Sequence, residues 1–181
     1  MAELVDSMLG RQSDRAPRGV ADACAKDQIT SFGQADPGTW QCWRADFGVA
    51  TAVDVTQTLI EFDRRAAAAG CTADGGGGLA RVLNEYWIPS AGTDPRNSGD
   101  VYGPEDLPSG DYDCGDGIRL DLQPDTAEAV EDFQLTGDLP VDASNGFENE
   151  NAPITLDAVR GLRGDLIMVV TASQAYFSYP K

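Results

Sequence analysis

The feature that most constrains the fold is a run of five consecutive apolar residues near the end of the chain. Residues 166–170 read Leu-Ile-Met-Val-Val, and Tyr176, Phe177 and Tyr179 follow shortly after. A strand with one solvent-exposed face alternates apolar and polar residues, whereas a continuous apolar run is covered on both faces. We therefore predict a buried strand over residues 165–179. It lies either at the centre of a sheet or beside a neighbouring subunit that completes it.

A helix is predicted over residues 54–69. Asp54 can cap its first turn, Gln57 stands three residues later, and Gly70 follows its last turn. Residues 51–62 are also rich in Thr, Val, Ile and Phe, so a strand is the alternative for this stretch. We favour the helix.

Two other segments complete the expected architecture. Residues 1–20 combine a short amphipathic start with Arg, Ser, Pro and Gly, which suits an extended arm as well as a helix. Ile118, Leu120 and Leu122 alternate with polar residues and predict a half-buried strand. The chain of 181 residues is long enough for one hydrophobic core. We expect a single, compact, loop-rich domain over residues 1–181, of α+β class with β structure dominant and a buried C-terminal strand.

Acidic residues outnumber basic residues by 30 to 13, which gives a net charge of −17. Residues 92–151 hold 16 of the acids and only two arginines, so we expect an acidic, loop-rich region there. Such a field repels phosphate backbones and anionic lipid surfaces, which excludes nucleic acid and membranes as partners bound through charge. The acidity is typical of a halophilic or marine protein, in which salt screens the charge, or of a protein that binds divalent cations.

The chain contains no histidine. This absence excludes Ser-His-Asp and Cys-His catalysis and metal sites with histidine ligands. No apolar stretch reaches the ~18 residues of a transmembrane helix, and residues 1–6 lack the basic and apolar regions of a signal peptide. We therefore expect neither a transmembrane segment nor a leader in this chain.

The four cysteines, Cys24, Cys42, Cys71 and Cys114, are widely spaced and form no C-x-x-C motif. An even number of cysteines near turn residues predicts two disulfides, with reduced and buried thiols as the alternative. Four cysteines allow three pairings, and the spacing does not choose among them.

The densest group of carboxylates comprises Asp111, Asp113, Asp116 and Asp121. The first three form a D-x-D-x-x-D-G pattern, which supplies the hard oxygen ligands that Ca²⁺ prefers. The pattern departs from an EF-hand, because Gly115 stands where a ligand is expected and no glutamate follows at the twelfth position. We expect an irregular calcium loop, with a solvated acidic turn as the alternative.

No arrangement of residues assigns a catalytic role, and no cofactor other than Ca²⁺ is expected. We expect a non-enzymatic structural or interaction subunit of an extracellular assembly or virion: a capsid decoration, coat, connector or appendage protein. It would act through protein–protein contacts as a homo-oligomer, shell or filament. The first alternative is a secreted, disulfide-stabilised binding protein for a glycan or calcium. The second is a glycoside hydrolase that uses two of the many carboxylates.

Overall fold

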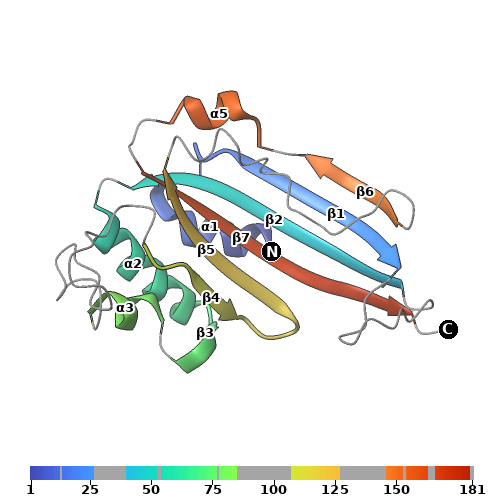
Figure 1. The fold of residues 1–181 in the computed structure, drawn as a ribbon, viewed down its shortest axis with the longest axis horizontal. Coiled ribbons are helices and arrows are strands. Elements are labelled where there is room, and N and C mark those ends of the chain that lie inside the picture. The colour runs from blue at the N-terminus through green and yellow to red at the C-terminus, as the bar shows by residue number, and fades with distance from the viewer. Residues whose placement is uncertain are drawn as a thin grey trace, which may run out of the picture.

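The chain forms one antiparallel sheet that carries helices on both faces, a mixed α+β fold (Figure 1). The computed structural model describes residues 1–12, 14–26, 40–52, 54–76, 78–84, 107–126, 146–152, 154–162 and 166–179. Within these ranges the strand order is β3-β4-β5-β7-β2-β1-β6. The strands are β1 (Arg18–Lys26), β2 (Trp40–Ala52), β3 (Thr72–Ala73), β4 (Gly110–Asp113), β5 (Ile118–Thr126), β6 (Gly146–Ala152) and β7 (Leu166–Tyr179). The helices are α1 (Ala2–Leu9), α2 (Val55–Ala68), α3 (Leu79–Val82) and α5 (Leu156–Arg160), with short 3-10 helices η1 (Gly10–Gln12) and η2 (Asp74–Gly76). None of these described helices is long and apolar enough to cross a membrane.

β7 lies in the middle of the sheet, between β5 and β2. Leu166, Met168 and Val170 pack on the face that α1 and α2 cover, here called the α1–α2 face. Ile167 and Val169 pack on the opposite face, the α5 face. All five side chains are at most 6% exposed. The apolar run is therefore a central strand buried on both faces, and β5 and β2 of the same chain complete it.

α1 covers the α1–α2 face where it crosses β2. Its Val5, Met8 and Leu9 are buried. Gly48 of β2 permits this approach, because a Cβ there would lie 2.7 Å from Leu9 Cδ1 and 3.2 Å from Val5 Cγ1. Of the two alternatives for the start of the chain, an arm or a helix, residues 2–12 take the helix. A glycine in the facing strand lets this short amphipathic segment sit on the sheet as a helix.

α2 confirms the helix predicted after β2. Asp54 is its N-cap residue, and the carboxylate of Asp54 accepts a hydrogen bond of 3.0 Å from the backbone N–H of Gln57. Leu59 and Phe62 are buried against the sheet. Of residues 51–62, for which a strand was the alternative, Thr51 and Ala52 belong to β2 and the residues from Val55 onward belong to α2. The local cap thus outweighed the β propensity of the following residues.

The α5 face has a smaller core. Ile154 and Val159 cover Phe47, Val49 and the two β7 residues that point to this side. The Phe47 ring lies against Gly19, the residue directly opposite it in β1. A glycine inside a strand leaves a gap in the side-chain layer, and an aromatic ring on the neighbouring strand fills that gap here.

The described part of the acidic region contains strands. Residues 92–151 provide β4, β5 and most of β6. Leu120 and Leu122 are buried, Asp121 between them is half-buried, and Arg119 and Gln123 on either side are exposed, which confirms the predicted alternation in β5. Alternation lets a charged segment pair as a strand because its polar residues remain on the solvated side. Residues 92–106 and 127–145 of this region lie outside the described residues.

Two disulfides are present, as the cysteine count predicted. Cys24 and Cys42 stand directly opposite each other on β1 and β2. Cys71, after α2, is bonded to Cys114, at the turn between β4 and β5. The sequence separations of 18 and 43 residues correspond to loop-closure contributions of about 3 and about 4 kcal/mol in the chain-entropy account. The second disulfide therefore ties the helical layer to the far edge of the sheet.

Substitution of Gly19 by valine is expected to lower the free energy of unfolding by about 1–3 kcal/mol, because the new side chain would occupy the space of the Phe47 ring. Urea denaturation followed by circular dichroism measures the change. Gly161→Ala is the control, since a Cβ there has its nearest neighbours at 3.4 and 3.6 Å and the φ of −71° suits alanine. Equal stability of the two variants would show that the packing of the Phe47 ring does not require glycine at position 19.

Candidate functional site

The four aspartates of the predicted calcium loop all belong to the β4–β5 hairpin. Asp111 and Asp121 are directly opposite each other on the two strands. Asp113 is opposite Arg119 on the same face, and Asp116 lies in the turn with a φ of 52°. The fold therefore brings three of the four aspartates to one face and leaves Asp116 apart from them.

Two of these aspartates take part in the turn itself. Asp113 Oδ1 accepts a hydrogen bond of 2.8 Å from the backbone N–H of Gly115. The backbone carbonyl of Asp116 accepts one of 2.9 Å from the Gln174 side chain. Among the described residues, no group of three or more Asp, Glu or Cys side chains is placed to hold a metal ion. The calcium loop stays a prediction, and the geometry of the hairpin adds no support to it.

Asp121 is the most perturbed carboxyl of the hairpin. Partial burial, and then the charge of Asp111 across the strand pair, raise its pKa to about 6 from an ordinary value of 3.8. Two carboxylates directly opposite each other on one face repel, and burial weakens their screening by water.

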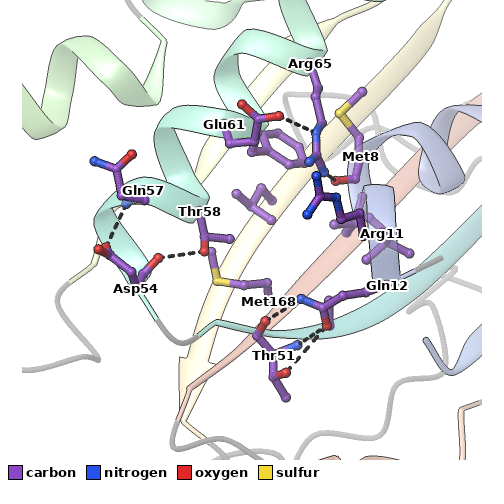
Figure 2. Close-up of a pocket in the computed structure, with 15 residues that line it drawn as sticks. Met8, Arg11, Gln12, Thr51, Asp54, Gln57, Thr58, Glu61, Arg65 and Met168 are labelled. Atoms are coloured by element: carbon purple, nitrogen blue, oxygen red, sulfur yellow. Dashed lines mark hydrogen bonds and ion pairs between the residues drawn. The ribbon is translucent and has the colours of Figure 1, made fainter. Parts of the chain in front are cut away.

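A cleft of about 520 Å³ opens on the α1–α2 face of the sheet, between η1 and α2 (Figure 2). Its floor is apolar and comes from α1, α2 and the three central strands. The floor residues are Met8, Leu9, Ala50, Phe62, Leu122, Met168 and Val170. Each is at most 6% exposed, so the floor is part of the core and is rigidly packed.

Gln12 forms the η1 wall by attaching to the edge of β2. Its side-chain amide donates a hydrogen bond of 2.8 Å to the Thr51 carbonyl and accepts one of 3.1 Å from the Thr51 backbone N–H (Figure 2). β1 begins at Arg18, opposite Gly48, so it does not reach this end of β2. The glutamine side chain therefore satisfies backbone groups that a neighbouring strand would otherwise pair.

α2 forms the other wall and carries two acidic groups. Asp54 caps the helix, and its backbone carbonyl accepts a hydrogen bond of 2.7 Å from the Thr58 hydroxyl. Glu61 accepts hydrogen bonds of 2.7 and 2.8 Å from Arg64 and one of 3.0 Å from Arg65. The bonds from Arg64, with a further contribution from Arg65, lower the pKa of Glu61 to about 2. Glu61 is therefore fully ionised at neutral pH.

Arg65 closes the end of the cleft where α1 meets α2. Its Nη1 donates a hydrogen bond of 2.7 Å to the backbone carbonyl of Met8, in the last turn of α1. Its guanidinium lies against Gly10, where an added Cβ would meet the Cζ atom at 2.6 Å. The φ of 55° at Gly10 also favours glycine, so one residue both ends α1 and makes room for Arg65.

Arg11 projects from η1 into the cleft, on the same side as the Arg65 guanidinium (Figure 2). Its side chain is exposed, and it makes no hydrogen bond or ion pair with any residue that the structure describes. In contrast, Arg18 pairs with Asp6 and Arg119 with Asp74. The cleft thus combines an apolar floor with a guanidinium that lacks a carboxylate partner in the described chain.

The sequence interpretation missed this cleft because its walls are far apart along the chain. Gln12 and Thr51 are separated by 39 residues, and Met8 and Arg65 by 57. The one local signal was the amphipathic start of the chain, which left the choice between arm and helix open.

Comparisons of the chain with protein-family models, with curated proteins and with solved structures find no match.

Replacement of Asp121 by asparagine is expected to raise the free energy of unfolding by about 1–2 kcal/mol near pH 8 and to leave it nearly unchanged near pH 4. The folded-state pKa of about 6 lies above the ordinary value of 3.8. Protonation therefore favours the native state, and that stabilisation is lost as the pH rises through about 6. Urea denaturation at both pH values checks the difference.

Asp111→Asn serves as the partner variant, because it removes only the smaller of the two causes and should give a smaller gain. A gain for Asp121→Asn that is equal near pH 4 and near pH 8 would rule out titration of this carboxyl as its origin.

Proposed function

We propose that this chain is a non-enzymatic binding protein of an oxidising compartment, and that its ligand occupies the cleft between η1 and α2. The observation that carries the proposal is the cleft itself. Its volume of about 520 Å³ falls in the range of small-molecule sites. An apolar floor with a few polar groups on the walls is also the usual composition of such sites. We therefore place the ligand in the cleft and not at the acidic region of residues 92–151.

The two disulfides support the choice of compartment. Disulfides persist in extracellular and periplasmic surroundings and are rare in reducing ones. Both cross-links join separate elements of the fold, at Cys24–Cys42 and Cys71–Cys114. They hold the sheet and its helical layer together, which preserves a preformed cleft.

The acidic groups of the cleft favour binding over catalysis. A glycoside hydrolase requires one carboxyl that holds a proton near neutral pH and donates it to the leaving group. Glu61, with a pKa of about 2, holds no proton there. Asp54 is committed to capping α2. The carboxylates that line the cleft therefore support its structure and do not provide an acid–base pair.

The placement of β7 affects the competing hypothesis of an assembly subunit. The apolar run was the segment expected to pair with a neighbouring subunit, and it is the central strand of its own sheet. Within the described residues, β6 forms one end of the strand order and pairs with β1 alone. Strand addition at β6 would have to accept the two glutamates of its sequence, Glu148 and Glu150, and charges on an edge strand oppose self-association.

Replacement of Thr58 by tryptophan is expected to abolish binding of small molecules, because Thr58 lines the cleft from the α2 wall and an indole would fill it. A thermal-shift screen of organic acids, alcohols, amines and sugars supplies ligands that raise the melting temperature of the wild type. Ala67→Trp is the matched control, since Ala67 is exposed on the same helix and does not line the cleft. A screen without any hit, or hits that persist in Thr58→Trp, would overturn the proposal.

The native mass is expected to be that of a monomer, 19.2 kDa, at low salt and at about 1–2 M salt, with calcium or with a chelator. Light scattering after size-exclusion chromatography measures it. Growth into a defined oligomer or polymer would favour the assembly subunit and would direct attention to the β6 edge.

A further inference from the structure

We propose that the ligand of this cleft is an anionic group carried on an apolar chain, with the anion at Arg11 and the chain along the floor. The inference rests on the proposed function and names the chemical class of the ligand. It follows from three features of the cleft: an unmatched cation, carboxylates that are already bound, and an apolar surface that leads away from the cation.

Arginines without a carboxylate partner are uncommon among the described residues: Arg11 and Arg15 share this property, and only Arg11 lines the cleft. The chain has 30 acidic and only 13 basic residues, so a carboxylate partner is available to most arginines. Arg11 has none among the described residues, although it lines the cleft and points into it (Figure 2). A guanidinium offers five N–H donors in a planar fork that matches a carboxylate, sulfate or phosphate group.

A second guanidinium lies at the same end of the cleft. Arg65 uses Nε for Glu61 and Nη1 for the Met8 carbonyl. Its Nη2 has no hydrogen-bond partner among the described residues and lies over the backbone of Gly10, next to Arg11 in the chain. An anion bound by Arg11 can therefore receive a further hydrogen bond from Arg65 without breaking the contacts that join α1 to α2.

The carboxylates that line the cleft do not cancel this positive charge. Glu61 is shared between Arg64 and Arg65, so two guanidinium groups neutralise one carboxylate. Asp54 is at the opposite end of the cleft, beyond Thr58, where it caps α2 (Figure 2). Among the described residues that line the cleft, the end that holds Arg11 therefore carries more positive than negative charge.

The apolar part of the ligand has a defined surface to contact. The floor includes Met8 and Met168, and Figure 2 shows Met8 on the side of Arg11 and Arg65 and Met168 on the side toward Thr58 and Asp54. Leu9, Leu122 and Val170 also belong to this apolar floor. Burial of a hydrocarbon chain on this surface is favourable by about 0.8 kcal/mol for each methylene removed from water. A sugar or a small inorganic anion would leave the floor unused, and a cationic amphiphile would place like charges together.

The experiment compares three ligands that share one hydrocarbon chain: decanoate, 1-decanol and decyltrimethylammonium. Isothermal titration calorimetry gives the Kd of each for the wild type, Arg11→Gln, Arg15→Gln and Thr58→Trp. Arg15 is the matched control, since it is an exposed arginine four residues away that does not line the cleft, and its replacement changes the net charge equally.

Decanoate is expected to bind the wild type most tightly, with Kd about tenfold higher in Arg11→Gln, unchanged in Arg15→Gln and beyond measurement in Thr58→Trp. Higher ionic strength should weaken decanoate and leave decanol unchanged. Equal affinity of decanoate for Arg11→Gln and the wild type would overturn the anion assignment, as would tighter binding of decyltrimethylammonium. If Thr58→Trp abolishes the binding observed in either of these cases, the proposed function of the cleft as a binding site is still supported, and only the class of ligand is wrong. Absence of binding by all three ligands would also overturn the inference. The thermal-shift screen of organic acids, alcohols, amines and sugars would then decide whether the cleft binds any small molecule.

Discussion

Burial of the apolar run of β7, residues 166–170, on both faces is the constraint on which the rest of the structure depends. Its thirteen-residue register with β2 places each apolar residue of the run on a fixed side. Ile167 and Val169 anchor α5, whereas Met168 and Val170 support α1 and α2 and also form the floor of the cleft. One strand therefore builds both cores and the candidate binding surface. A shift of register by a single residue would exchange the two faces and remove all three together.

The distribution of charge is compatible with this core because the strands of the acidic region separate charged from apolar residues. β4 and β5 carry their aspartates on one face and their apolar residues on the other. Nearer the centre of the sheet, Arg44 lies between Asp22 and Asp46, at 3.6 and 3.3 Å. Both carboxylates are only 13% exposed, so Arg44 supplies the positive charge that they need at this partly buried position. These ion pairs reduce repulsion within a chain of net charge −17, whose stability comes from apolar burial and two disulfides.

The parts of the fold that the sequence predicted are those whose causes are local. The cap at Asp54 defines α2, and the apolar run at residues 166–170 defines β7. α1 could not be separated from an arm, because its burial depends on Gly48 in a strand that is distant in sequence. The disulfide pairing likewise depends on the register of β1 against β2. The cleft required tertiary structure for the same reason. The calcium site predicted at the acidic hairpin stays a prediction, and there Asp113 accepts a hydrogen bond from the backbone N–H of Gly115.

The contacts of Arg65 with Met8 and of Gln12 with Thr51 attach the N-terminal helix to the body of the protein. A molecule in the cleft would contact η1, α2 and the sheet at once, so it could bind only while α1 is packed on the sheet. By linkage, occupancy must then shift the opening equilibrium of α1 toward the closed state. The first twelve residues of the chain would therefore report whether the site is filled, through slower exchange of their amide hydrogens and greater resistance to proteases.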